Sequence, residues 1–319
     1  MKAKVESPVL FIVFNRPETT QIVFDAIKSS RPQKLYIAAD APRAGNEGDR
    51  QNCAQVKEIV KQVDWDCDTY YRFAETNQGC GPGPYNAISW AFKNEDRLII
   101  LEDDCVPAQP FFSYCNELLE RYKKDTRIWL ISGDQYNEEA VKTPHSYFFS
   151  RYGHSWGWAT WKRCWDAMDM SMSKYPLIIE QDLYKAAFRT NKETRFFQKK
   201  IDKIYNDNYS KSHIWDYQFG FAITSNGGLS IVPRKNLVKN IGYLGTHSET
   251  KNQFHDRPID ENFKIISHPD FILCDVNYDA YHFKHHWNRK TPLLKRVIRK
   301  IERILKESKN KRKLCSYTL

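Results

Sequence analysis

Short apolar runs alternate with helix-like segments along the N-terminal third of the chain. The runs are VLFIVFN, KLYIAAD, TYYRFAE and RLIILEDD, and amphipathic stretches such as ETTQIVFDAIKSS and DRQNCAQVKEIVKQV lie between them. A strand followed by a helix, repeated, builds a parallel sheet whose crossover helices cover both faces. The pattern therefore predicts an α/β fold with a mostly parallel central sheet.

The length and composition suit one large domain. A chain of 319 residues with 41% hydrophobic content can bury a substantial core. The regular alternation ends near residue 126, and the later segments read as mixed strands and loops. We therefore expect residues 1–126 and 127–288 to be two halves of one domain, followed by a tail over residues 289–319.

The tail holds most of the positive charge. The chain has a net charge of +10, and residues 290–313 contain eleven Lys or Arg against two Glu. Leucine, isoleucine and valine recur on one helical face there, which predicts a basic amphipathic helix suited to an anionic membrane surface. The alternative is a helix that docks on the core and ends in a solvated charge run. The remaining body is close to neutral, so no nucleic-acid partner is implied.

No segment is long enough to cross a bilayer, since the first apolar run spans only residues 9–14. No cleavage site follows that run, so we expect a cytoplasmic protein that can attach to the inner face of the membrane through its tail. The eight cysteines form no CxxC pair, which favours free thiols over disulfides or a zinc site.

Polar residues follow several of the predicted strands. Asn15 and Arg16 follow the first strand, Asp40 follows the second, and LIILEDDCVP carries Glu102, Asp103 and Asp104 at the end of a later one. Parallel sheets bind ligands at the carboxyl ends of their strands. We therefore expect these side chains to meet at one edge of the sheet.

Three adjacent carboxylates repel one another and need a positive counter-charge. A hard divalent cation such as Mg2+ or Mn2+ supplies one, because it prefers oxygen ligands from carboxylates and phosphates. The alternative is an acidic turn that caps the following helix, since carboxylates favour helix N-termini.

The LEDDCVP turn before a helix that carries Phe-Phe, together with the later segment HIWDYQFGFAI, resembles nucleotide-sugar glycosyltransferases of the GT-A fold. The pattern is most similar to the N-acetylglucosaminyltransferase I type, over residues 8–250. The resemblance implies a Rossmann-like GT-A sheet, with donor binding in residues 1–126 and acceptor binding in residues 127–288. It also implies that Asp104 holds Mn2+ or Mg2+ on the diphosphate.

The resemblance further implies that Glu102 and Asp103 face the ribose and the donor sugar, and that Asp216 is the catalytic base. An acceptor hydroxyl must lose its proton as it attacks the anomeric carbon, and a nearby carboxylate can accept it. Alternatively, Asp216 caps a helix. Asp134 and Glu138 are rival candidates for the base.

Further donor contacts are expected around the same edge. The resemblance implies that Arg16 meets the diphosphate, Asp40 the uracil, and Asn15 the nucleotide. It places Asn77 and Gly79 of the loop ETNQGCGPGPYN near the nucleotide, and His247 of NIGYLGTHSE on the diphosphate or the metal. The glycine loop lacks the spacing of a dinucleotide fingerprint.

Two aromatic segments remain ambiguous. The tryptophans of RYGHSWGWATWKRCW either line sugar pockets or belong to the core. The histidines of YHFKHHW include an i, i+4 pair suited to a metal, but no third ligand is evident in the sequence nearby, which favours a surface or interface role.

These features predict a metal-dependent, inverting transfer of a sugar from a UDP-sugar to a saccharide or a lipid-linked saccharide. One alternative is a sugar-nucleotide nucleotidyltransferase, but such enzymes carry a glycine-rich loop after the first strand, and FNRPETT has no glycine. The other alternative is a non-catalytic basic protein that binds membranes or nucleic acid.

Overall fold

The computed structural model describes residues 5–207, 214–243 and 254–289 of the chain. Residues up to Tyr281 belong to one compact unit. The predicted basic tail and His247 lie outside the described residues, so both stay predictions.

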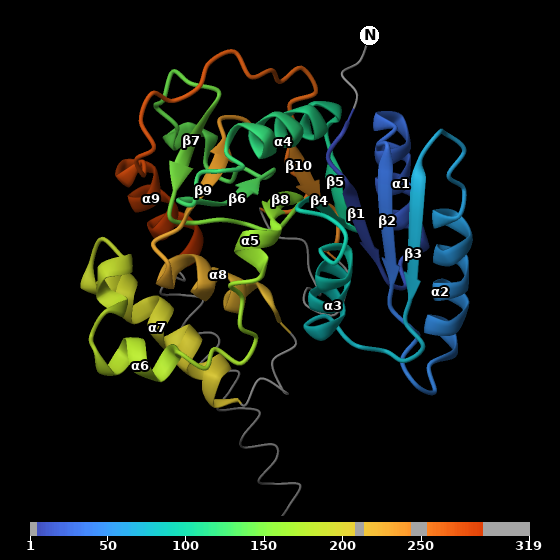
Figure 1. Cartoon of the computed structure of the whole chain (residues 1–319), viewed down its shortest axis with the longest axis horizontal. Coiled ribbons are helices and arrows are strands. Elements are labelled where there is room, and N and C mark those ends of the chain that lie inside the picture. Colours follow the sequence, from blue (N-terminus) through green and yellow to red (C-terminus); the bar gives the residue numbers. More distant parts are fainter. Residues whose placement is uncertain (1–4, 208–213, 244–253, 290–319) are drawn as a thin grey trace, which may run out of the picture. The chain divides into compact units, whose positions relative to one another are not determined.

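An eight-stranded sheet organises this unit, in the order β3-β2-β1-β4-β8-β6-β9-β7 (Figure 1). The pairings show that β8 and β7 run against the other six strands. A second small sheet pairs β5 with β10 in antiparallel fashion. The strands are β1 (Val9–Val13), β2 (Lys34–Ala39), β3 (Asp68–Phe73), β4 (Arg97–Glu102), β5 (Cys105–Pro107), β6 (Ile128–Ser132), β7 (Tyr147–Ser150), β8 (Trp158–Trp161), β9 (Leu229–Pro233) and β10 (Val238–Asn240).

Helices flank the sheet. They are α1 (Pro17–Ser30), α2 (Glu47–Val60), α3 (Pro82–Ala91), α4 (Gln109–Arg121), α5 (Lys162–Trp165), α6 (Tyr175–Glu180), α7 (Asn191–Asn206), α8 (Asp216–Ser225) and α9 (Val276–His282). The connections through α1 and α2 lead from β1 to β2 and from β2 to β3, in one direction across the sheet. The connection through α3 leads in the opposite direction, from β3 to β4. Right-handed crossovers therefore place α3 on the opposite face. The predicted α/β fold, with a mostly parallel sheet flanked by helices, is confirmed.

Local chemistry explains where the first helices begin. Pro17 opens α1, where its missing N–H costs no hydrogen bond. Asn46 caps α2 by accepting a hydrogen bond from the backbone N–H of Asp49 at 3.0 Å. These starts fix how each polar loop leaves its strand and enters the next helix.

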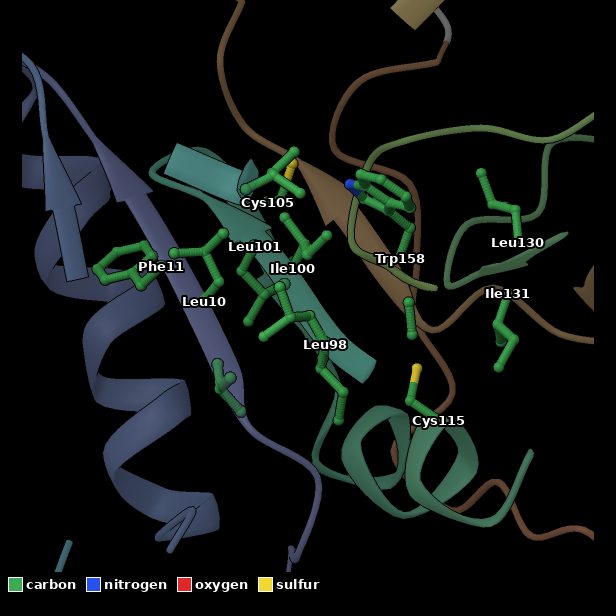
Figure 2. Packing of buried hydrophobic residues seen from close by; sticks show 14 of the residues in the cluster. Leu10, Phe11, Leu98, Ile100, Leu101, Cys105, Cys115, Leu130, Ile131 and Trp158 are labelled. Carbon is green, nitrogen blue, oxygen red and sulfur yellow. The ribbon is translucent and has the colours of Figure 1, made fainter. Parts of the chain in front are cut away.

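The core is continuous through both halves of the sequence. Leu10 and Phe11 of β1, Leu98 and Ile100 of β4, and Trp158 of β8 are fully or almost fully buried, and Figure 2 shows these side chains along the strands of the sheet. Strand β8 from the second half lies between β4 and β6. The two predicted halves therefore share one sheet.

The ambiguous tryptophans divide unequally between core and surface. Trp158, Trp161 and Trp165 are 0%, 3% and 4% exposed, whereas Trp156 is only partly buried. Three of the four therefore belong to the core, and only Trp156 retains exposed ring surface.

The seven cysteines of the described residues are free thiols, as the sequence predicted. Among the described helices, none combines the length and apolar character needed to cross a membrane.

Replacing Trp158 by Ala tests this core. Its ring packs on Trp165, on Trp215 and on Phe219, so the truncation leaves a large cavity. We expect the free energy of unfolding to fall by about 3–5 kcal/mol in urea denaturation. Leu183→Ala is the matched control, because that side chain is 53% exposed, and it should change stability by less than about 0.5 kcal/mol. Equal effects of the two substitutions would contradict this packing.

Candidate functional site

The polar residues that follow β1, β2 and β4 meet at one edge of the sheet. Strand β1 lies between β2 and β4 and is parallel to both, with Val13 opposite Ala39 and Ile12 opposite Glu102. The segments after these three strands therefore leave the sheet at the same level. The sequence-based expectation of a shared polar edge is met.

Arg16 holds the acidic turn together. One guanidinium nitrogen donates to Oδ2 of Asp104 at 2.9 Å, and the other donates to Oδ1 of Asp103. The backbone N–H of Phe14 also donates to Asp103, at 3.1 Å. Part of the counter-charge that the acidic triplet requires therefore comes from the chain itself, from the loop after the neighbouring strand.

The triplet remains electrostatically crowded despite Arg16. Burial raises the pKa of Glu102 well above its ordinary value, and the negative charges of Asp104 and Asp103 add to the effect. Burial also raises the pKa of Asp103, although Arg16 opposes this shift. A further cation at this turn would therefore relieve repulsion that Arg16 leaves uncompensated.

Asn240 and Gly242 also shape the turn, and sequence reasoning missed both. Asn240 donates to Oδ1 of Asp104 at 3.2 Å and accepts from the backbone N–H of Gly242 at 2.8 Å. The N–H of Ile241 donates to the carbonyl of Asp104 at 2.9 Å. These contacts orient the Asp104 carboxylate from the β10 side of the small sheet. The bond between Asn240 and Asp104 joins residues 136 positions apart, so no local sequence pattern signals it.

The acidic turn fits a cation held by few protein ligands. The Asp104 side chain is 13% exposed and that of Asp103 is 4% exposed, so Asp104 is the more accessible of the two. An accessible carboxylate beside a second one suits Mg2+ or Mn2+, which is commonly bound through one or two carboxylates and completes its shell with phosphate oxygens and water.

Asp40 organises the glycine loop. Its carboxylate accepts hydrogen bonds from the backbone N–H groups of Gln78 and Gly79, both at 2.9 Å, and from the side chain of Asn77 at 3.1 Å. Gly79 has φ +76°, a conformation that glycine adopts without strain. The structure thus brings Asp40, Asn77 and Gly79 together, and a contact of any of them with a nucleotide stays a prediction.

Asn15 turns toward a second polar cluster. Its side-chain amide donates to Oδ1 of Asp49 at 2.7 Å. Arg43 also pairs with Asp49, at 2.5 Å, and its guanidinium lies 5.8 Å from the centre of the Phe14 ring. Asn15 therefore ties the loop after β1 to the start of α2.

Asp216 is the first residue of α8, is exposed, and has Trp215 before it in the capping position. Burial is the main cause of the raised pKa of Glu102, and the negative charge of Asp216 adds to it after those of Asp104 and Asp103. Trp215 stacks on Trp158 with ring centres 5.5 Å apart and planes at 24°. The buried tryptophan of β8 thus fixes the start of α8 and the position of Asp216.

The two rival bases lie in different surroundings. Asp134 is 2% exposed, and Glu138 accepts hydrogen bonds from Lys235 at 2.8 Å and from the backbone of Asn236 at 2.9 Å. Of the three, Asp216 is the exposed one.

Gly242→Ala tests the close approach of β10 to the turn. An added Cβ would lie 1.9 Å from Oδ2 of Asp104 and 2.8 Å from Nη1 of Arg16, so the ion pair must move. We expect the free energy of unfolding to fall by about 1–3 kcal/mol. Gly220→Ala is the control, since nothing lies within 4 Å of its added Cβ inside α8 and alanine favours a helix. If Gly242→Ala were as stable as Gly220→Ala, the packing described here would be wrong.

Asp134→Asn tests the buried carboxyl through pH. Burial raises the pKa of Asp134 to about 7, whereas an unfolded chain has a value of about 4. The folded protein keeps a proton that the unfolded chain releases in this interval, so Asp134 lowers stability progressively as pH rises from about 4 to about 7. The Asn variant cannot ionise, and we expect it to gain about 2–4 kcal/mol relative to the parent between pH 5 and pH 8. Urea titrations at pH 5 and at pH 8 measure the free energy of unfolding of both proteins. The same difference between variant and parent at the two pH values would contradict the raised pKa of Asp134.

Comparison with known proteins leaves the family open. No known family model matches the chain, and no curated protein does. A UDP-glucose pyrophosphorylase complexed with UDP-glucose overlaps 50% of this chain and 78% of its own, at 6% identity and a TM-score of 0.28. HddC from Yersinia pseudotuberculosis overlaps 53% of this chain and 85% of its own, at 10% identity and a TM-score of 0.31. Partial overlaps of this size carry no assignment of activity.

Proposed function

We propose that this chain is an enzyme that binds a nucleotide sugar at the carboxyl edge of its sheet and transfers the sugar to an acceptor. The observation that carries the proposal is the pairing of Arg16 with Asp103 and Asp104 at that edge, and the exposed Asp216, whose charge adds to the raised pKa of Glu102, supports it. Metal-dependent glycosyl transfer requires carboxylates that can hold a metal ion, a positively charged side chain that binds the diphosphate, and a carboxylate that accepts the proton of the acceptor hydroxyl.

The donor half of the reaction uses Asp104 and Arg16. Asp104 would hold Mn2+ or Mg2+, which when bound neutralises charge on the departing nucleoside diphosphate. The guanidinium of Arg16 has five N–H donors, and the two carboxylates engage it through two nitrogens. Its remaining donors can bind phosphate oxygens, which favours Arg16 as the diphosphate contact. The glycine loop that Asp40 holds would border the nucleoside.

The acceptor half uses Asp216. Its exposed carboxylate can accept the proton of a hydroxyl that attacks the anomeric carbon. The new bond to the acceptor oxygen forms as the bond to the diphosphate breaks, so direct displacement inverts the anomeric configuration. A saccharide or lipid-linked saccharide is the acceptor class that we propose.

The nucleotidyltransferase alternative shares the sheet and the metal requirement. It needs a loop after β1 that wraps a triphosphate, and residues 14–17 supply one arginine and no glycine. The absence of glycine there favours sugar transfer. The two activities give different products.

The experiment offers the full chain two substrate pairs with Mn2+. With a UDP-sugar and either water or a saccharide as acceptor, we expect UDP release and a product of inverted anomeric configuration by NMR. With UTP and a sugar 1-phosphate, we expect no pyrophosphate. Release of pyrophosphate without UDP would establish the alternative, and a retained anomer would remove Asp216 from its role.

Asp216→Asn should lower kcat for UDP release by about a hundredfold to ten-thousandfold, because the amide cannot accept the proton. The shift in melting temperature that UDP and Mn2+ cause together should persist in this variant. Glu138→Gln is the matched control and should keep the parent kcat. A normal kcat in Asp216→Asn with a loss in Glu138→Gln would reverse the assignment.

A further inference from the structure

Trp156 keeps part of its ring exposed, unlike the three tryptophans that follow it in the same segment. Trp158, Trp161 and Trp165 belong to the core, whereas Trp156 packs against the core and stays only partly buried. Neither the proposed metal turn nor the proposed base uses this ring. A partly exposed aromatic ring beside a candidate active site can pack on the apolar face of a sugar.

Strand pairing places Trp156 at the level of the acidic turn. Strand β8 is antiparallel to β4, so its amino end lies beside the carboxyl end of β4, and Trp158 lies opposite Ile100. In an antiparallel pair, two residues back along one strand correspond to two residues forward along the other. The chain at Trp156 therefore reaches the level of Glu102.

Gly157 fixes the backbone next to Trp156. Its carbonyl accepts a hydrogen bond from the N–H of Gly133 at 2.8 Å, and its φ of +65° is one that glycine adopts without strain. A Cβ added at Gly157 would lie 2.7 Å from a methyl carbon of Val238 in β10. The segment before β8 thus packs closely on β10, whose last residue, Asn240, contacts the acidic turn.

Two aromatic neighbours orient the Trp156 ring. The ring of His255 lies nearly parallel to it, with centres 5.6 Å apart and planes at 20°, and the ring of Tyr136 meets it at 60° with centres 5.6 Å apart. The backbone N–H of Asp256 donates to the carbonyl of Asn240 at 2.7 Å, which anchors His255 beside β10. A ring that is held before a ligand arrives loses little conformational freedom on binding.

The same segment leads to the proposed base. Trp158 stacks on Trp215, and Trp215 directly precedes Asp216 at the start of α8. A stretch of three residues, 156–158, therefore connects the level of Glu102 with the side chain that fixes the start of α8.

We infer that Trp156 is the platform on which a pyranose ring of the acceptor stacks. The inference rests on the proposed function and deepens it, because it names the acceptor as a saccharide that presents an apolar ring face. The glycine loop proposed for the nucleoside is bound by Asp40, which follows β2. Strand β8 lies on the other side of β4 in the sheet, which assigns Trp156 to the acceptor rather than to the nucleoside.

The first experiment needs neither donor nor turnover. The full chain is labelled with fluorinated tryptophan, and Trp156→Phe and Trp65→Phe identify the two signals by fluorine NMR. On titration with the methyl pyranosides of glucose, galactose and N-acetylglucosamine, we expect at least one sugar to shift the Trp156 signal to saturation while the Trp65 signal stays in place. Trp65 is the matched control, because it is also partly buried but precedes β3, at the opposite edge of the sheet.

Three results would overturn the inference. They are a Trp156 signal that none of the three sugars moves, equal shifts of the Trp156 and Trp65 signals, and a Trp156 shift that only a UDP-sugar causes. The last result would assign the ring to the donor.

Kinetics with a UDP-sugar and Mn2+ give a second readout, with the pyranoside that shifts the signal as acceptor. Trp156→Ala should raise KM for this acceptor on the order of tenfold, without a comparable change in KM for the UDP-sugar, because it removes only the stacking surface. Trp156→Phe keeps an aromatic face and should recover most of the loss, and Trp65→Ala should leave KM for the acceptor unchanged.

A lower kcat with an unchanged acceptor KM in Trp156→Ala would indicate a purely structural role and would refute the inference. Absence of UDP release from the parent protein would instead refute the proposed function. The two failures are distinguishable, since the fluorine signals report saccharide binding without turnover.

Discussion

The pairing of Arg16 with Asp103 and Asp104 is the interaction on which the candidate site depends. Strand β4 leads three carboxylates to the edge of a buried sheet, where burial and the neighbouring negative charges raise the pKa of Glu102 and of Asp103. Arg16 reaches them because β1 pairs directly with β4 and ends at the same level. Removing one partner of such a pair leaves a buried charge uncompensated, which costs more than the pair contributes.

The rest of the site is built around this pair. The small sheet of β5 and β10 brings Asn240 against Asp104 from the opposite side. Strand β8 enters the sheet beside β4, and its Trp158 stacks on Trp215 at the start of α8. The acidic turn and the start of α8 with Asp216 are therefore held by the same core.

Much of this architecture could be predicted from the sequence, because it follows from local periodicity. Apolar runs that alternate with amphipathic segments define the parallel strands, and polar residues after those strands must then share an edge. This reasoning located Arg16, Asp40 and the acidic turn. It could not locate Asn240 or Gly242, because their contacts with Asp104 depend on which distant strand pairs with β5. Nor could it tell a core tryptophan from a pocket tryptophan, since spacing alone is the same for both.

The most direct test of the account is to locate the metal ion in a crystal structure. Crystals of the full chain grown with UDP and Mn2+ should show an anomalous scattering peak for manganese within coordination distance of Asp104, with the diphosphate between the metal and Arg16. A nucleotide bound away from the carboxyl edge of β4, or manganese bound elsewhere than at Asp104, would contradict the account.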